Sequence, residues 1–351
     1  MMSLAFIVPG RLTTLTGGSI YDRRIIEGLR RRGWAVDVHE VSESFPRPSA
    51  DALDEAARTF ASIADGSTVI VDGLAFGAMP DVVRPHARRL KTVALVHLPL
   101  GAEVGLDPAE AGEMEASERR ALALARAVVV TGPTTSAAFA NSGIAPEKIT
   151  VVEPGTDPAS IATGSIDETL RLLCVATISP GKGQEGLLRA LAANRDHDWK
   201  LMCAGSLTRH PATVERVQRL LVAEGIADRV ALLGEVEPAS LESHFVHADI
   251  FVLNSLQETY GMAVAEAVAH GLPVVSTRTG GIPGLIGGEA GLIVDPGDVG
   301  ALTGALRRVL GDSGLRASLR DGAMRARGRL EPWDVAVGRM AEALERVIAD
   351  G

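Results

Sequence analysis

Two carboxylates in the segment QETYGMAVAEAVAHGLPVV (257–275), Glu258 and Glu266, are the first candidates for chemistry. If the chain is helical across both, they lie about 12 Å apart along the axis and about 80° apart around it, so one ligand could contact both. Gly261 would let that ligand approach the backbone, and the free N–H groups at the start of the helix would bind a diphosphate. The alternative is a capping Glu258 and an exposed Glu266. The apolar neighbours of Glu266 favour function, because an unpaired carboxylate among them is costly.

The elements that must position these residues are short β-branched runs that alternate with longer amphipathic stretches. Such continuous apolar strands, separated by helices, predict parallel sheets covered by helices on both faces. The runs fall into two sets, 4–8, 36–41, 68–73, 92–97 and 127–132, then 170–177, 199–206, 230–236, 249–255, 272–281 and 290–295. Ligands of such sheets bind beyond the carboxyl ends of the strands, so we expect the chemistry in the loops that follow them.

A stretch of linker composition, PGTDPASIATGSIDET (154–169), separates the two sets of strands. We therefore predict an α/β protein with two doubly wound domains, the first over 1–158 and the second over 159–332. The amphipathic segment 333–351 predicts a last helix that packs back on the first domain.

Composition excludes several classes of protein. The chain has 35 Lys and Arg against 44 Asp and Glu, a net charge of -9, and only 12 aromatic residues, so we expect no nucleic-acid partner. Cys174 and Cys203 lie in apolar runs and predict buried thiols, with no metal site. The first strand is too short for a signal segment, and no run reaches the ~18 apolar residues of a membrane span. We expect a cytoplasmic protein, with peripheral contact to a membrane as an option through the basic stretch DRRIIEGLRRR (22–32).

The pattern E-x-[FY]-G-x4-E, followed by HGLPVV and TGGIP, resembles the signature of retaining glycosyltransferases of family 4, which have the GT-B fold. The resemblance implies two Rossmann-like domains that face a central cleft. The second would bind a nucleoside-diphosphate sugar and the first a hydroxyl acceptor, such as a glycan, a lipid or a small molecule. It also implies transfer of a hexose with retained configuration and without a metal ion or other cofactor.

The resemblance assigns roles to residues of the second half. Glu266 would bind the ribose hydroxyls and Glu258, as a catalytic residue, the sugar hydroxyls. Lys182, in VATISPGKGQEG, would be a second catalytic residue and would neutralise the diphosphate together with the backbone at Gly261 and Met262. The alternative is that Lys182 is an exposed loop lysine with no role in function.

Other residues that match the family's landmarks have weaker patterns of their own. The donor-binding set implied by the resemblance also includes Gly17 and Gly18, Gly234 and Glu235, and Tyr260. His97, at the end of TVALVH, stands where similar enzymes place a catalytic histidine facing the transferred sugar. Without the family, two glycines predict a turn and a lone histidine a structural role.

Two positions depart from the family's pattern. Thr177 stands where an arginine is common, so Arg278, Arg209 or a substrate group would have to replace that charge. Gly284 stands where a glutamate is common. These departures keep open the alternative of a catalytically degenerate nucleotide-sugar-binding protein. A second alternative is an enzyme of similar fold, such as a nucleotide-sugar epimerase.

Overall fold

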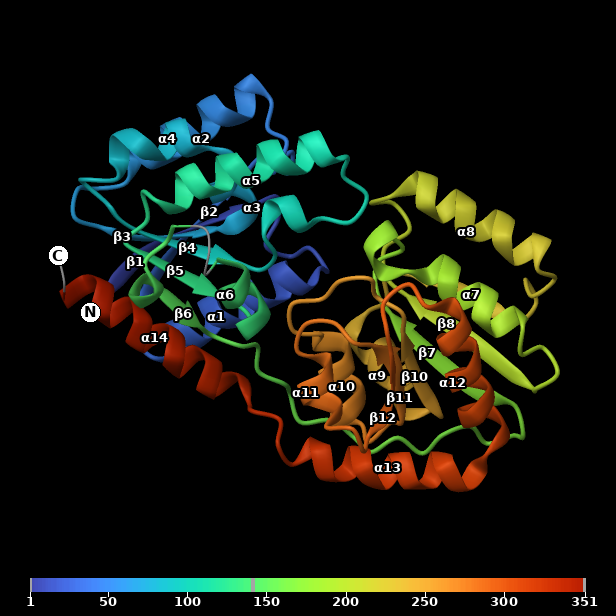
Figure 1. Cartoon of the computed structure of the whole chain (residues 1–351). Coiled ribbons are helices and arrows are strands. Elements are labelled where there is room, and N and C mark those ends of the chain that lie inside the picture. The colour runs from blue at the N-terminus through green and yellow to red at the C-terminus, as the bar shows by residue number, and fades with distance from the viewer. Residues whose placement is uncertain (1, 140–142, 350–351) are drawn as a thin grey trace. The chain divides into compact units, whose positions relative to one another are not determined.

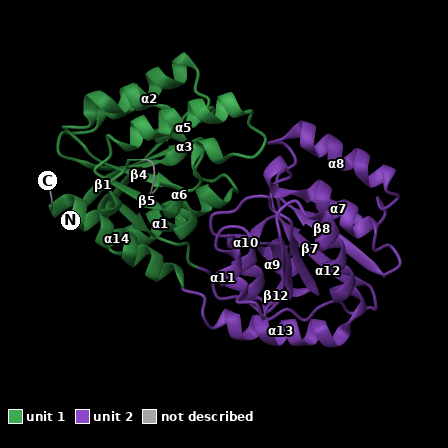
Figure 2. Cartoon of the chain, viewed as in Figure 1, with its two compact units in different colours: residues 1–155, 332–351 green, residues 156–331 purple. Residues whose placement is uncertain are grey.

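The structure is a computed structural model that describes residues 2–139 and 143–349. The chain forms two compact units, shown in different colours in Figure 2. The first comprises Met1–Gly155 and Pro332–Gly351, and the second Thr156–Glu331. The domain boundary predicted at 158/159 lies three residues after the observed boundary between Gly155 and Thr156.

The first unit is a six-stranded parallel sheet in the order β2-β1-β3-β4-β5-β6 (Figure 1). Its strands are β1 (Ser3–Pro9), β2 (Ala35–Val41), β3 (Thr68–Asp72), β4 (Lys91–Val96), β5 (Ala127–Val130) and β6 (Ile149–Val151). Its helices are α1 (Gly17–Arg31), α2 (Ala50–Ser62), α3 (Gly73–Ala78), α4 (Pro80–Val83), α5 (Pro108–Leu122), α6 (Pro133–Phe139) and α14 (Trp333–Ala349), with short 3-10 turns η1 (Arg84–His86), η2 (Leu100–Ala102) and η3 (Pro146–Lys148).

The second unit is also a six-stranded parallel sheet, in the order β12-β11-β10-β7-β8-β9. Its strands are β7 (Leu170–Val175), β8 (Trp199–Ala204), β9 (Val230–Gly234), β10 (Ile250–Leu253), β11 (Val274–Thr277) and β12 (Gly291–Val294). Its helices are α7 (Gln184–Ala192), α8 (Pro211–Ala223), α9 (Pro238–Val246), α10 (Met262–Ala269), α11 (Ile282–Ile286), α12 (Val299–Gly311) and α13 (Ser313–Arg327), with one 3-10 turn, η4 (Pro180–Lys182).

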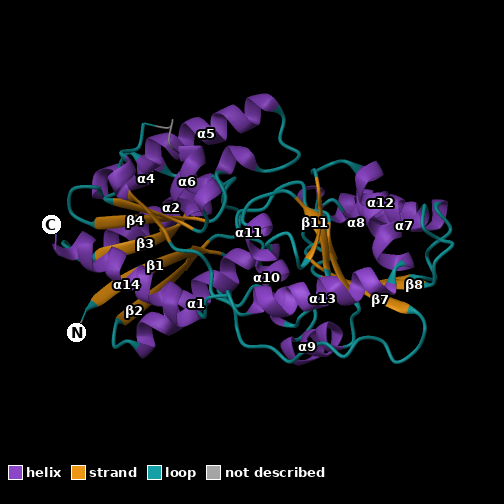
Figure 3. Cartoon of the chain, turned by 60° about the horizontal axis from the view of Figure 1, so that its bottom comes forward, coloured by secondary structure: helices purple, strands orange, loops and turns teal. Residues whose placement is uncertain are grey.

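Each sheet lies between layers of helices, and Figure 3 shows the strands flanked on both faces. The central strands are buried throughout, as the apolar runs predict: β3 and β10 expose no residue. The prediction of two Rossmann-like parallel sheets is confirmed, and every strand run read from the sequence forms a strand. The sequence pattern did not indicate β6, a three-residue edge strand whose residues are only half-buried.

Helix α14, red in Figure 1, belongs to the first unit and lies along α1. The two helices approach closely because Gly28 has no side chain: a Cβ there would lie 2.2 Å from Val337 Cγ2. At the other end of α14, Lys91 Nζ donates a hydrogen bond of 2.8 Å to the carbonyl of Ile348. The C-terminal segment is therefore fastened to the first unit at both ends of α14.

The arginines of α1 are partly used by contacts with α14. The guanidinium of Arg24 lies 5.9 Å from the ring centroid of Trp333, and Arg31 lies 3.9 Å from the carboxylate of Asp334. Arg32 donates to the carbonyl of Asp334.

Membrane contact through the basic stretch 22–32 stays a prediction, as does the cytoplasmic location. Within the described residues, no helix combines the length and the apolar character that crossing a bilayer requires.

Each sheet has a point where the strand order reverses. In the first unit it lies between β1 and β3, and in the second between β7 and β10. Loops that leave the carboxyl ends of the two strands at such a point diverge to opposite faces of the sheet and leave a crevice for ligands. The topology therefore directs attention to the loops after these four strands.

Candidate functional site

Lys182 and Glu258 meet at the reversal point of the second sheet. Lys182 lies in the loop after β7, and Glu258 lies in the loop after β10. The distance from Lys182 Nζ to Glu258 Oε1 is 2.5 Å, a short charge-assisted hydrogen bond. The lysine side chain is 31% exposed and the glutamate 12%, so the pair is accessible from solvent on the lysine side.

Contacts to the backbone of the Lys182 loop explain why these residues meet across 76 positions of sequence. Gly183 has a φ of +63°, and a Cβ there would lie 2.1 Å from the carbonyl oxygen of Asn254. Asn254 Nδ2 donates to the carbonyl of Gly183 at 2.9 Å, and Leu256 N donates to that of Gly181 at 2.8 Å. Only glycine permits this approach, so the glycines around Lys182 hold its loop against the loop of Glu258.

Two hydroxyl groups fix Glu258. Ser255 Oγ donates to Glu258 Oε1 at 2.7 Å, and Thr279 Oγ1 accepts from the backbone N–H of Glu258 at 3.0 Å. The TGG segment also backs this loop, because a Cβ on Gly280 would lie 2.3 Å from the carbonyl oxygen of Glu258. Nothing in the sequence singles out Ser255, although it lies two residues after the buried strand β10, where parallel sheets place functional side chains.

The helical relation expected between Glu258 and Glu266 is wrong. Helix α10 begins at Met262, so Glu258 lies in the preceding loop and only Glu266 lies on the helix. The reason is Gly261, whose φ of +99° is left-handed and ends any helical path from Glu258. The N–H groups of Met262 and Ala263 have no acceptor within the helix, and anion binding there stays a prediction.

The remaining donor-binding candidates of the second unit lie at the end of β9, in the loop of Glu258 and on α10. Gly234 ends β9, with a φ of +72°, and Glu235 after it is exposed. Strand β9 is two strands from β7, a separation of about 10 Å in a parallel sheet. Tyr260 follows the Glu258 loop, but its side chain is buried. Glu266 is half-buried on α10.

Ser255→Ala tests whether the position of Glu258 is important. We expect about a tenfold lower kcat in the reaction that the resemblance implies, because a hydrogen bond to a charged group contributes about 1.5 kcal/mol or more. Ser276→Ala is the matched control, since Ser276 Oγ is a buried hydroxyl on the neighbouring strand that donates to the carbonyl of Leu253 instead. Equal effects of the two variants on kcat would show that Ser255 is only structural.

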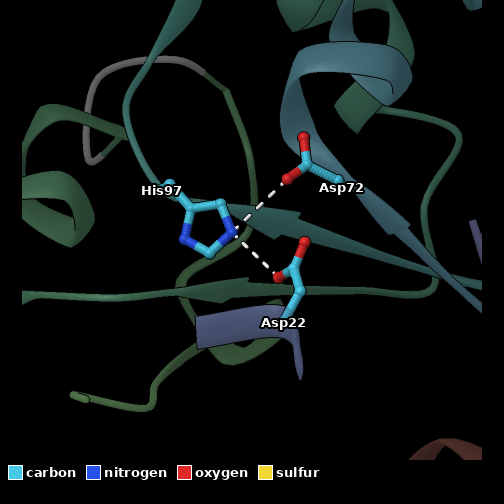
Figure 4. Close-up of side chains that lie close together, drawn as sticks. All are labelled: Asp22, Asp72 and His97. Carbon is cyan, nitrogen blue, oxygen red and sulfur yellow. Dashed lines mark hydrogen bonds and ion pairs between the residues drawn. The ribbon is translucent and has the colours of Figure 1, made fainter. Parts of the chain in front are cut away.

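A second polar cluster lies at the reversal point of the first sheet. His97 directly follows β4, Asp72 ends β3, and Asp22 lies in the second turn of α1, which follows β1. His97 Nε2 lies 3.0 Å from Asp22 Oδ1 and 3.4 Å from Asp72 Oδ2 (Figure 4). Both carboxylates are buried and the imidazole is 19% exposed, so the histidine is the part of the cluster that reaches solvent.

The start of α1 is built around the imidazole. Thr16 caps the helix by accepting from Ser19 N, which places Gly17 and Gly18 in its first turn. Residues three and four apart share a helix face, so Gly18 is on the same side as Tyr21 and Asp22. A Cβ on Gly18 would lie 3.2 Å from His97 Cδ2. Gly18 therefore has a local reason to be glycine, namely room for this ring, besides any role with a donor.

Two further contacts fix the cluster. The ring of Tyr21 meets that of His97 edge-on at 5.2 Å, and its hydroxyl donates to the carbonyl of Val152 at 2.8 Å. Asp72 is the N-cap of α3, and its Oδ1 accepts from Leu74 N at 2.7 Å while its Oδ2 faces His97. Each carboxylate is thus placed by a separate element.

The cluster shifts the pKa of two of its members. Burial lowers the pKa of His97, but the carboxylates of Asp22 and then Asp72 outweigh burial and raise it to about 10. Burial raises the pKa of Asp22 to about 7 against the lowering effect of His97. Their ligand atoms and that of Asp72 lie within 4.8 Å of one another, the one such group in the described part of the chain.

We compared the sequence and the structure with those of known proteins. Residues 169–312 match the family model described as glycosyl transferases group 1. The match lies in the second unit and contains Lys182, Glu258 and Glu266. The predicted resemblance to glycosyltransferases is confirmed for this part of the chain, and the predicted fold is that of solved glycosyltransferase structures.

Two relatives illustrate the similarity of sequence. A D-inositol 3-phosphate glycosyltransferase of Corynebacterium diphtheriae is 31% identical over 223 residues, 58% of this chain and 51% of that protein. An MMP alpha-(1->4)-mannosyltransferase of Mycolicibacterium hassiacum is 25% identical over 335 residues, 90% of this chain and 80% of that protein. The matched part spans about half the length of the inositol 3-phosphate glycosyltransferase.

Solved structures share the fold over the chain's length. Sucrose-phosphate synthase from Thermosynechococcus elongatus superposes with a TM-score of 0.84 at 21% identity, covering 100% of both chains. HepE from Anabaena, solved in complex with UDP and glucose, superposes with a TM-score of 0.74 at 17% identity, covering 97% of this chain and 99% of HepE.

Proposed function

We propose that this protein is a retaining glycosyltransferase that moves a hexose from a nucleoside-diphosphate sugar to a hydroxyl acceptor without a metal ion. The observation that carries the proposal is the Lys182–Glu258 pair at the reversal point of the second sheet, where the loop of Glu258 leads into the N-terminus of α10. A cation and free backbone N–H groups suit a diphosphate, and a carboxylate suits sugar hydroxyls. The relatives named above are glycosyltransferases, and HepE binds UDP and glucose.

In this proposal the diphosphate binds at Lys182 and at the backbone of Gly261 and Met262. The lysine and the helix N-terminus stabilise the negative charge that grows on the leaving phosphate as the bond to the sugar breaks. A divalent ion does the same work in other transferases, and these groups would replace it. The departing phosphate oxygen accepts the proton of the acceptor hydroxyl, which attacks from the same face.

Glu258 then accepts hydrogen bonds from the hydroxyls of the transferred sugar. Ser255 keeps the carboxylate in place when Lys182 turns to the diphosphate. Glu266 on α10 binds the ribose hydroxyls, and the backbone at Gly234 and Glu235 contacts the base.

We assign the charge missing at Thr177 to Arg209. The loops after β7 and β8 are joined by a hydrogen bond from Ile178 N to the carbonyl of Ser206, and Arg209 lies three residues further on, exposed. Arg278 is less suitable, because its Nε is paired with the Asp295 carboxylate at 3.2 Å.

Thermal unfolding with UDP, GDP, ADP and TDP and their sugars, with and without EDTA, tests the donor. We expect one nucleotide series to raise the Tm, because a ligand that binds only the folded state stabilises it by mass action, and EDTA to leave the rise unchanged. The best donor is then incubated with hydroxyl acceptors, D-inositol 3-phosphate among them, and the anomeric configuration of the product is read by NMR.

Each alternative has its own outcome in the same experiment. An epimerase converts the donor with no acceptor present, and a degenerate binding protein raises its Tm but leaves the donor intact with every acceptor. No stabilisation by any nucleotide would contradict nucleotide-sugar chemistry altogether, and a shift abolished by EDTA would contradict metal independence.

A further inference from the structure

A cavity lies at the amino ends of β1, β2 and β3 in the first unit, and we refer to it as the amino-end cavity. Its volume is about 670 Å³, within the roughly 300–1,000 Å³ of small-molecule sites. We propose that it binds a small organic acid, whose phosphate or carboxylate group contacts the guanidinium of Arg30 and the indole N–H of Trp34. This proposal does not depend on the function proposed above.

The amino-end cavity is separate from the polar cluster of the same unit. Ser3 is the first residue of β1, Ala35 is the first of β2, and Ser67 directly precedes β3. Asp72 ends β3 and His97 follows β4, so both lie at the opposite edge of the sheet. The five residues of β3 place the two edges about 16 Å apart. A ligand in the amino-end cavity therefore leaves the cluster at the carboxyl ends free.

Small side chains explain why there is space here. On β1 and β2, Ser3 lies opposite Ala35, and both line the cavity. The end of α2 and the turn after it contribute Ser62 and Ala64. Protein interiors are closely packed, and these four short side chains leave space that larger ones would fill. All four are exposed, so a ligand can enter from solvent.

Arg30 supplies a cation without a carboxylate partner. Its Nη2 donates to the carbonyl of Val36 at 2.8 Å, which holds the guanidinium against the edge strand β2. Among the described residues, no carboxylate forms an ion pair with it. The next residue, Arg31, lies 3.9 Å from Asp334 instead. The planar donors of an arginine match the paired oxygens of a phosphate or a carboxylate, so Arg30 is suited to bind either acid.

Trp34 supplies a donor that has no acceptor. The residue is only 5% exposed, and its Nε1–H makes no hydrogen bond to the described part of the chain. The nitrogen is nevertheless not fully enclosed, and the side chain lines the cavity. A buried indole usually finds a partner, as Trp199 does by donating to the carbonyl of Asn194 at 3.0 Å. The N–H of Trp34 is therefore left for a ligand that accepts a hydrogen bond.

The charges around the cavity favour an anion. Asp37 is the one acid among the described residues that line it, and its Oδ2 lies 3.1 Å from His39 Nε2. The carbonyls at the end of α2 form the negative end of a helix dipole. Arg89 caps them, donating from Nη1 to the carbonyl of Ile63 at 2.6 Å and from Nη2 to that of Phe60 at 2.5 Å. The negative groups thus have partners of their own, whereas the two donors described above do not.

The size and the walls of the cavity favour an organic ligand over a free ion. The volume is about twenty times the roughly 30 Å³ that a water molecule occupies in the liquid, so an inorganic ion would fill a small part of it. Leu4, Val36 and Ile63 are buried apolar residues that line the same cavity. They would cover the carbon frame of a ligand whose acidic group lies at Arg30.

NMR of protein labelled with ¹⁵N at tryptophan locates the ligand. The chain has three tryptophans, and the indole signal of Trp34 is assigned by its loss in Trp34→Phe. We expect glucose 6-phosphate or glucuronate to shift this signal saturably and to leave that of Trp199 in place. Glucose has the same ring without the acid and should cause no shift. A response to only one of the two acids supports the proposal and identifies the acidic group that the site takes.

The wild-type spectra alone can overturn the proposal, and they require no variant to fold. An unchanged Trp34 signal with both acids would show that the cavity binds neither. A shift of the same size with glucose would show that no anion is recognised.

Arg30→Gln tests the cation. We expect the Kd read from the Trp34 signal to rise at least ~10-fold, because a hydrogen bond between two charged groups is lost. Arg31→Gln is the matched control, since it removes the same charge from the next, exposed residue, which does not line the cavity. Equal weakening in both variants would mean that only the general surface charge matters and would overturn the contact.

Lys182→Ala separates this site from the one proposed for the diphosphate, because a phosphate could also bind at Lys182. We expect the Trp34 signal to respond to glucose 6-phosphate in this variant as it does in the wild-type protein. Loss of the response would place the phosphate at Lys182 and overturn the proposal. Failure of every nucleotide to raise the Tm would contradict the proposed function alone.

Discussion

Lys182→Ala should lower kcat for sugar transfer by at least ~100-fold, which is the effect of losing one preorganised electrostatic contact to a developing charge. The diphosphate departs with negative charge that it does not carry in the intact donor, so the ammonium group contributes more in the transition state than in the ground state. The structure adds a second effect. Removing the lysine leaves Glu258, 12% exposed, without its cation, and this carboxylate would then repel the diphosphate.

The measurement is kcat and KM with the donor identified by thermal unfolding, with transfer and donor hydrolysis both assayed. Lys182→Arg keeps the charge and should retain more activity than Lys182→Ala. Lys200→Ala is the matched control, because Lys200 is an exposed lysine on strand β8 of the same unit. A kcat for Lys182→Ala within a factor of a few of the wild-type value would remove Lys182 from the catalytic residues.

The sheets were predictable because strands that are buried on both faces consist of unbroken apolar residues. Strands such as TVIVD (68–72) and IFVL (250–253) are unbroken apolar runs, and parallel sheets require this pattern. Glycine patterns also identified the loop of Lys182, which the left-handed Gly183 follows. A short edge strand such as β6 lacks such an apolar run, since its residues are only half-buried.

The side chains around the candidate residues were not predictable in the same way. Asp22 and His97 are 75 positions apart, and nothing in either segment indicates that they form an ion pair. Their contact depends on strand order, because β1 and β4 are separated only by β3. The helical spacing of Glu258 and Glu266 failed for a local reason, the left-handed backbone at Gly261. Periodicity identifies which residues are buried, but the contacts between loops follow from topology.

Glu258→Ala should also lower kcat at least ~100-fold, because in the proposed function the carboxylate binds the sugar and directs Lys182. Glu258→Gln separates these two roles. The amide keeps an oxygen that can accept hydrogen bonds from sugar hydroxyls and from Ser255, but it cannot pair with a cation. We expect Glu258→Gln to retain more activity than Glu258→Ala, with the remaining loss due to charge. Equal activity of Gln and wild-type enzymes would show that the charge of Glu258 has no role.

The double variant Lys182→Ala/Glu258→Ala shows whether the two residues act as a unit. Independent sites would multiply to a loss of about 10⁴-fold, since the effects of distant residues on free energy add. The Nζ–Oε1 distance of 2.5 Å predicts a smaller loss, because each single variant already misplaces the partner and leaves a partly buried charge unpaired. The double variant should therefore be hardly less active than either single variant. It should also unfold at a higher urea concentration than Lys182→Ala, because it no longer contains the uncompensated carboxylate. A full multiplicative loss would instead mean that the pair separates when the donor binds and that each residue then acts alone.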